Sequence, residues 1–331
     1  MLATRLRLAI SVLAWTYAGT VLFLVSVFQL LPNDAWLPTV LLYAPRWVWA
    51  IPGLLLLTPA VFQMRKLVLP LVMSVLLVVW LVMGFSLPWR MLLVDSDETG
   101  RLRVLSCNCG GPGFEASRLL ALIDDLQPDV VALQECSSKD AEAIRAPGTW
   151  HFHREDDLTL FSRFPIERTQ AYQSKFSTWH PTRAVTYQLR PGPSSISFVN
   201  LHLETPREGL EALLGRDRDA IATIRQNTIR RRNEANAVAS LADGVGRPGL
   251  LAGDFNLPVE SSLYEDAFGS YQNAFSRAGW GFGYTKFTRW HGVRIDHILG
   301  TDDWSVRRCW VGTDVGSDHR PVIADVSLLP Q

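Results

Sequence analysis

The feature that most constrains this chain is a set of long, uncharged apolar runs confined to its first ninety residues. Residues 8–31 and 67–87 contain no Asp, Glu, Lys or Arg, and a further run over 47–62 is interrupted by Pro52 and Pro59. A helix needs about 20 apolar residues to cross a bilayer. We therefore predict three transmembrane helices, the second of which reaches full length only with help from residues near 37–44.

A secretory signal peptide is the alternative interpretation of the first run. The apolar core of a signal peptide is about 7–15 residues long, and here the run is longer and two more follow. We therefore expect a membrane domain over residues 1–98 and a second domain over 99–331.

The positive charges that flank the runs predict an orientation. Arg5 and Arg7 precede the first run, and Arg65 and Lys66 separate the second from the third. Short cytoplasmic loops carry the excess of Lys and Arg. We predict a multi-pass protein of the plasma or inner membrane whose loop at 33–34, linker at 95–98 and second domain are extracytoplasmic, although Arg46 and Arg90 on the outer side weaken this pattern.

Charge and cysteine content indicate which partners and which kind of fold are favoured for the second domain. The chain holds 32 basic and 32 acidic residues, and six basic and four acidic ones lie before residue 99, so the remainder is weakly acidic. Nucleic-acid affinity comes mainly from neutralised phosphates, which makes nucleic acid a less favoured partner. The four cysteines are too few for a disulfide framework.

Polar side chains follow apolar runs at several places in residues 101–328. The run 249–252 ends in Gly253-Asp254-Phe255-Asn256, a pattern typical of a buried strand that stops at a turn. The same holds for Asn108, Glu135 and His202. Many strands and few helices predict two packed sheets with helices outside, and the strand–helix–strand order over 101–133 predicts a crossover unit.

These residue types suit phosphoester hydrolysis. Mg²⁺ prefers oxygen ligands, which Asn108 and Glu135 supply. Asp254 can orient and deprotonate water, while Asn256 can hold the phosphate or that water. The two histidines, His202 and His319, can donate to phosphate oxygens, and Asp296 can raise the pKa of His319 as a carboxylate partner does.

Taken in order, these motifs resemble the endonuclease/exonuclease/phosphatase superfamily. The resemblance covers about residues 101–328 and rests on seven motifs: Asn108, Leu133-Gln134-Glu135, Ser162-Arg163-Phe164-Pro165, Asn200-Leu201-His202, Gly253-Asp254-Phe255-Asn256, Arg294-Ile295-Asp296-His297-Ile298 and Ser317-Asp318-His319-Arg320-Pro321. It implies a four-layer α/β/β/α sandwich of two mixed sheets flanked by helices, preceded here by the three spans, and dependence on Mg²⁺ or Mn²⁺.

The resemblance also implies a role for each matching residue. The metal ligands would be Asn108, Glu135 and Asp318, and the catalytic residues would be Asp254, His319, Asn256, His202 and Asp296. Where some nucleases of the family carry an acid two residues after the asparagine, this chain has Gly110, which counts against an abasic-site nuclease.

The sequence therefore predicts a membrane-anchored, metal-dependent phosphodiesterase or phosphatase that acts outside the cytoplasm on lipid headgroups or other small phosphoesters. The alternatives are an extracytoplasmic nuclease and a non-catalytic binding module on the same fold. The sequence specifies neither the oligomeric state nor whether Cys109 and Cys136 form a disulfide or are small buried hydrophobic residues.

Overall fold

A computed structural model describes residues 2–31, 35–89, 100–145, 149–175 and 181–329. The predicted loop at 33–34, the linker at 95–98 and the domain boundary at residue 98 lie outside the described residues. The division into 1–98 and 99–331 therefore stays a prediction.

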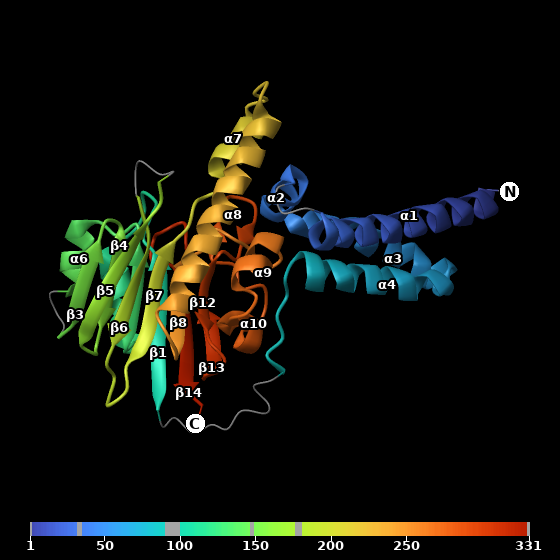
Figure 1. Ribbon diagram of the computed structural model, residues 1–331. Helices are drawn as coiled ribbons and strands as arrows, with labels where there is room; N and C mark the ends of the chain where they lie inside the picture. The colour runs from blue at the N-terminus through green and yellow to red at the C-terminus, as the bar shows by residue number, and fades with distance from the viewer. Residues whose placement is uncertain (1, 32–34, 90–99, 146–148, 176–180, 330–331) are drawn as a thin grey trace.

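The apolar runs form a helical bundle that extends away from the sheets (Figure 1). Two helical stretches, Thr4–Leu30 within α1 (Leu2–Leu30) and Arg65–Val82, are long and apolar enough to cross a membrane. A third candidate is the pair Trp36–Tyr43 and Arg46–Gln63, which is bent by 89°. Residues near 37–44 therefore form a separate helix, roughly perpendicular to the one that follows, and do not extend it in a straight line.

The remaining helices of this part pack around α1 through a shared apolar core. In chain order they are α2 (Trp36–Tyr43), η1 (Arg46–Ala50), α3 (Ile51–Gln63), η2 (Arg65–Leu67), α4 (Val68–Leu77) and η3 (Val78–Val82). The hydroxyl of Tyr17 donates to the carbonyl of Trp49 at 3.0 Å, which ties α1 to η1.

The first sheet has the strand order β13-β14-β1-β2-β4-β3. Its strands are β1 (Arg101–Asn108), β2 (Val130–Gln134), β3 (His151–Glu155), β4 (Leu158–Ser162), β13 (Trp304–Val311) and β14 (Val322–Leu328). The parallel pair β1 and β2 is joined by α5 (Ala116–Leu126), which confirms the predicted crossover, and α6 (Ser138–Arg145) packs beside α5.

The second sheet has the order β5-β6-β7-β8-β12-β9. Its strands are β5 (Ile166–Gln173), β6 (Thr182–Leu189), β7 (Ile196–His202), β8 (Gly249–Asp254), β9 (Gln272–Asn273) and β12 (Asp296–Gly300). Helices α7 (Arg207–Leu214) and α8 (Ala220–Gly244) connect the parallel pair β7 and β8, and α9 (Ser262–Phe268) and α10 (Ala274–Ala278) follow. A separate hairpin pairs β10 (Lys286–Phe287) with β11 (Gly292–Val293).

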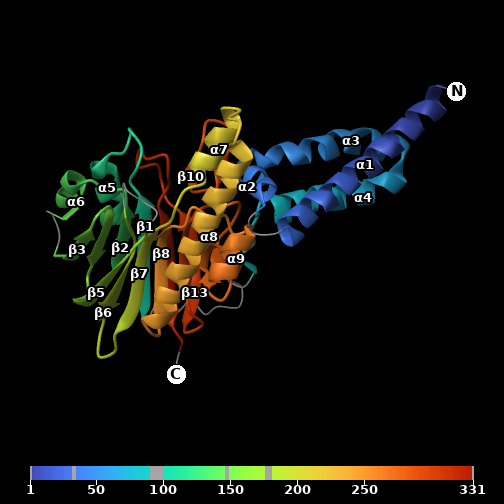
Figure 2. The ribbon, with the colours of Figure 1, turned by 45° about the horizontal axis from the view of Figure 1, so that its top comes forward.

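The two sheets pack face to face, with helices on both outer faces (Figure 2). Side chains such as Val104, Phe198 and Leu250 fill the space between the sheets. One outer face packs against α5 and α6, and the other packs against α8 and α9. The predicted four-layer sandwich is confirmed.

The sequence did not predict the edge strands β3 and β5. Their residues are mostly half-buried or exposed, so they lack the apolar run that identifies β2 or β8. The long helix α8 runs from Ala220 to Gly244, and a short helix, α7, precedes it.

Candidate active site

The rim of the second sheet brings three of the predicted residues into register. His202 at the end of β7 pairs with Asp254 at the end of β8, and Asp254 pairs with Asp296 at the start of β12. Parallel strands end at the same edge of a sheet, so the carboxyl ends of β7 and β8 meet there. The antiparallel β12 brings its first residue to the same edge.

The rim of the first sheet supplies two more. The amide nitrogen of Asn108, at the end of β1, donates to Oε1 of Glu135 and to Oδ2 of Asp254, each at 3.0 Å. Its amide oxygen accepts from the backbone N–H of Gly110 at 2.8 Å. Residues separated by 146 positions in the chain thus contact each other across the two sheets.

Two aspartate–histidine pairs flank Asp254. Nδ1 of His319 lies 2.8 Å from Oδ2 of Asp296, as predicted, and Nδ1 of His202 lies 2.8 Å from Oδ2 of Asp157, a partner that the sequence did not suggest. The free ring nitrogens, Nε2, lie 3.7 Å and 3.8 Å from Oδ2 of Asp254. Each imidazole is therefore oriented by a carboxylate and presents its other nitrogen to the same oxygen.

Burial and neighbouring charges shift the pKa values of these groups. Burial opposes protonation of His202, but its hydrogen bond to Asp157 and the charges of Asp254, Asp157 and Glu135 raise its pKa to about 9. Burial opposes protonation of His319 too, and the charges of Asp296 and Asp254 raise its pKa. Burial and the charge of Asp296 raise the pKa of Asp254, which makes it a stronger base.

Asn256 is held in place by contacts that reach the N-terminal helices. Its backbone N–H donates to Oδ1 of Asp254 at 2.8 Å, and its amide nitrogen donates to the carbonyl of Leu203 at 2.9 Å. Its carbonyl accepts from Arg231 of α8 at 2.7 Å and from the hydroxyl of Tyr43 in α2. Arg231 also donates to that hydroxyl at 2.8 Å.

Asp318 lies at the edge of the site. Its carboxylate pairs with Lys286 of β10 and is 44% exposed, and its Oδ1 is 4.0 Å from Nε2 of His319. Lys286 also forms a β-bridge with His319. The loop between β10 and β11 contacts α2, where His291 bonds to the carbonyl of Tyr43 at 2.9 Å.

Two arrangements in the site could hold a metal ion. Asp254, Asp296 and His319 offer ligand atoms that all lie within 4.8 Å of one another. However, Nδ1 of His319 already bonds to Asp296, and this group is buried. The second arrangement is Glu135, whose carboxylate is 43% exposed, with Asp254 on the other side of Asn108; carboxylate oxygens suit a hard divalent cation.

Backbone conformation also marks the site. Glu135 and Asn256 have positive φ angles of 52° and 48°, which are uncommon outside glycine and concentrate at functional positions. Gly110 leaves room for the Glu135 carboxylate, because a Cβ there would collide with Oε2. The departure noted at Gly110 therefore creates space beside the acid.

The four cysteines are free, buried thiols. Cys107, Cys109 and Cys136 belong to the core beneath α5, and burial raises the pKa of Cys109 well above its usual value. The structure favours the interpretation of Cys109 and Cys136 as small hydrophobic residues.

Sequence reasoning missed Asp157, Lys286, Tyr43 and Arg231. Asp157 directly precedes the apolar strand β4, so it shares the strand-end position of the other site residues. Tyr43 and Arg231 have no such signal, since each lies in a helix far from the motifs.

Comparisons with known proteins identify the family and the fold. The model of the Endonuclease/Exonuclease/phosphatase family matches residues 105–319. No curated protein matches the chain significantly. A family protein from Bacteroides thetaiotaomicron has 17% identity and a TM-score of 0.51, covering 70% of this chain and 98% of its own.

Two further solved structures are similar in fold. Humanized D. rerio TDP2 is 15% identical with a TM-score of 0.54, covering 69% of this chain and all of its own. The mannosyl-6-phosphatase Bt3783 of Bacteroides thetaiotaomicron VPI-5482 is 18% identical with a TM-score of 0.51 and the same coverage. Because the family model spans well over half of the sequence, the chain belongs to the endonuclease/exonuclease/phosphatase family.

Proposed function

We propose that the protein is a membrane-anchored, metal-dependent phosphoester hydrolase whose site faces outside the cytoplasm. The observation that carries this is the arrangement around Asp254: two carboxylate-oriented histidines approach its Oδ2, and Asn108 from the other sheet donates both to that oxygen and to Glu135. A binding module needs no base flanked by two potential proton donors.

Each side chain has a role that follows from its contacts. Asp254 takes a proton from the attacking water, a task that its raised pKa favours. His319, oriented by Asp296, and His202, oriented by Asp157, donate hydrogen bonds to the phosphate as negative charge develops. Asn256 orients Asp254 through its backbone N–H.

Glu135 and Asn108 would hold Mg²⁺ or Mn²⁺, with Asp318 at the edge. A flip of the Asn108 amide would turn its oxygen toward Glu135 and Asp254. A divalent ion bound there would polarise the phosphoryl oxygens and neutralise their charge.

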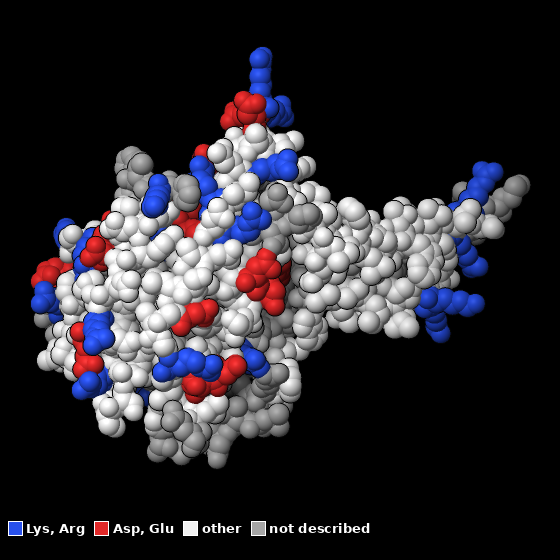
Figure 3. Space-filling model, in the orientation of Figure 1, with Lys and Arg blue, Asp and Glu red and all other residues white. Residues whose placement is uncertain are grey.

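Anchoring is supported by the apolar helices and by the charges at their ends. Lys and Arg gather at the end of the helical bundle that lies farthest from the sheets. The rest of the bundle surface in this view is uncharged (Figure 3). Arg65 and Lys66 form η2, at the turn between the second and third candidate spans. By the positive-inside rule this end is cytoplasmic, which puts the site on the opposite side of the membrane.

The substrates that fit best are lipid headgroups or other small phosphoesters. The site is linked to the outer end of the spans through Tyr43 and His291, and Trp47 and Trp290, both exposed, meet beside it. Tryptophan is enriched at membrane–water interfaces. Substrates at the membrane surface would thus reach the site directly.

The test is turnover of a generic phosphodiester, a phosphomonoester and a dispersed phospholipid by the full-length protein, with and without Mg²⁺. We expect Mg²⁺-dependent release that Asp254→Asn and His319→Gln each reduce by at least about a hundredfold. Unchanged activity in both variants would refute the assignment. Efficient Mg²⁺-dependent nicking of DNA of arbitrary sequence would instead support the nuclease alternative.

A further inference from the structure

A cavity of about 360 Å³ lies where the helical bundle meets the second domain. Its walls come from the C-terminal ends of α1 and η3, from the segment Gly84–Leu87 (the strap), and from residues that follow β8 and precede β12. The lining includes Phe28, Trp80, Phe85, Trp89, Glu260 and Arg294, and it includes none of the active-site residues.

Buried charges are unbalanced at this junction. Nη1 of Arg46 pairs with Oε2 of Glu260 at 2.9 Å and also donates to the carbonyl of Val82 at 2.9 Å. Arg294 is 4% exposed, and its Nε and Nη1 have no hydrogen-bond partner among the described residues. Nη2 of Arg46 is unpartnered in the same way, so two guanidinium groups share one carboxylate.

This imbalance needs compensation, because a buried charge without a partner is costly. Burial lowers the pKa of Arg294, whereas the charges of Arg46 and Arg294 overcome burial and hold the pKa of Glu260 below its usual value. Glu260 approaches the strap so closely that a Cβ at Gly84 would collide with it. The cluster therefore carries a net positive charge beside an open volume.

We propose that this cavity binds the phosphate group of an anionic membrane lipid, with Arg294 as its main contact. In the proposed orientation the cavity lies at the outer ends of the spans, where lipid phosphates are located. Its tryptophans, Trp80 and Trp89, are the residues typical of that layer. The inference rests on the anchoring proposed above and is independent of the hydrolytic activity.

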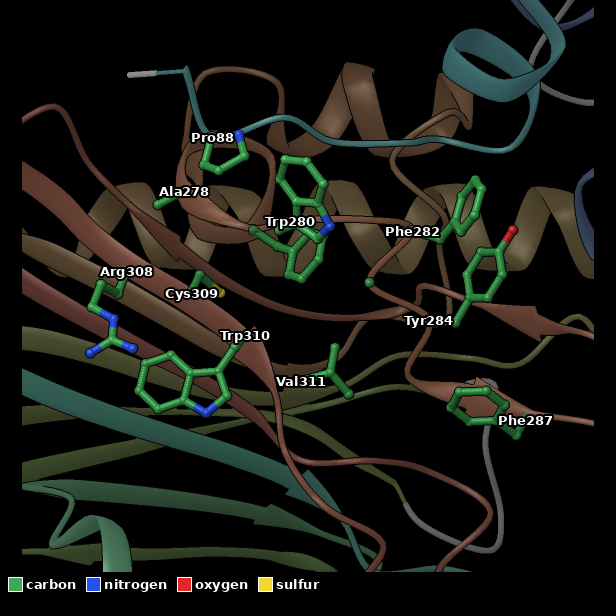
Figure 4. Close-up of a pocket in the computed structure, with 12 residues that line it drawn as sticks. Pro88, Ala278, Trp280, Phe282, Tyr284, Phe287, Arg308, Cys309, Trp310 and Val311 are labelled. Carbon is green, nitrogen blue, oxygen red and sulfur yellow. The ribbon is translucent and has the colours of Figure 1, made fainter. Parts of the chain in front are cut away.

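A second cavity, of about 680 Å³, is lined in part by Pro88, which directly follows the strap, and serves as a contrast (Figure 4). Aromatic rings such as Trp280, Tyr284 and Trp310 line it. Its arginine, Arg308, is exposed and lies over the ring of Trp310 at 5.2 Å. An exposed arginine is solvated and needs no bound anion, so Arg308 is a matched control for Arg294.

The test is calorimetric titration of the full-length protein in a neutral detergent with EDTA, which removes turnover. The probes are dihexanoyl phosphatidylglycerol, dihexanoyl phosphatidylcholine and inorganic phosphate. We expect the anionic lipid to bind at least about tenfold more tightly than either of the others. Arg294→Gln should weaken it by about 10- to 100-fold, as expected for a hydrogen bond to a charged group, and Arg308→Gln should leave it unchanged.

Glu260→Gln provides a second test in case Arg294→Gln does not fold. It removes the negative charge of the cluster, so affinity for the anionic lipid should rise by about tenfold. Unchanged or weaker binding in Glu260→Gln, or equal affinity for the two lipids, would overturn the proposal. Inorganic phosphate binding as tightly as the anionic lipid would overturn a lipid as the source of the anion.

Discussion

Tyr43→Phe tests whether the N-terminal helices support the loop that follows β8, which carries Asn256. The substitution removes only a hydroxyl, which donates to the carbonyl of Asn256 and accepts from Arg231 at 2.8 Å. Asn256 and Arg231 are 6% and 3% exposed, so water does not easily replace the lost bonds. The hydrogen bond from a charged donor contributes about 1.5–3 kcal/mol and the neutral one about 1 kcal/mol.

The loss should therefore be about 3 kcal/mol of docking free energy between α2 and the loop that follows β8. Asn256 keeps its bond from Arg231 and its own bond to Asp254, so the loop stays folded but is held less firmly. If half of that free energy orients Asp254 in the transition state, kcat falls about tenfold. KM should change little, because the phosphate contacts from His202 and His319 remain.

The assay is Mg²⁺-dependent turnover of a soluble phosphodiester by the full-length protein, together with its melting temperature. Tyr17→Phe is a matched control: it removes a hydroxyl that donates to Trp49 at 3.0 Å within the membrane domain. That variant should lose stability and keep its kcat. If Tyr43→Phe folds with wild-type kcat, or if both variants lose the same activity, the reasoning is wrong.

Three further predictions concern metal, pH and thiols. Glu135→Gln should weaken activation by Mg²⁺ at least about tenfold in a metal titration, and an unaltered activation curve would exclude Glu135 as a ligand. Burial lowers the pKa of His297 to about 4, so only the unfolded chain gains a proton between about pH 6.5 and 4. Stability should fall by about 3 kcal/mol as pH drops through that window, and melting curves of His297→Gln should show a flatter dependence. The buried cysteines should resist alkylation in the native protein and all react after denaturation without reductant; two protected thiols would reveal a disulfide.

Much of the second domain followed from sequence because its buried strands and its chemistry share one pattern. An apolar run such as that of β8 is buried on both faces, and the polar residue that ends it lies at the sheet rim. Asp254 and His202, which end their strands, were therefore predictable from their positions, whereas Asp296 begins its strand. The pairing of Asp296 with His319 was predicted from the chemistry of a carboxylate beside an imidazole and from the family resemblance, and the distance of 2.8 Å agrees with it.

Other parts carried no periodic signal. In the edge strand β5 apolar and polar residues alternate poorly, and most of its side chains are exposed. It is a strand mainly because it forms hydrogen bonds to β6, and these require β6 to be in place. The pair of His202 with Asp157 links residues 45 positions apart on different sheets. Only the packing of β4 against β7 brings them together, which no local pattern encodes.

Polar contacts join the two parts of the chain, beside aromatic ones such as those of Phe85 with Trp280 and Phe282. Arg46 with Glu260, Tyr43 with Asn256, and the strap residue Ser86 with Gly281 join segments about 200 residues apart. Displacing one partner of a buried polar contact costs free energy. Such contacts therefore favour one relative placement of the two parts of the chain over sliding. In the proposed orientation the catalytic rim is then held at a fixed height above the bilayer. A substrate confined to the membrane surface would meet the site in a constant geometry, whereas a soluble substrate would gain nothing from it.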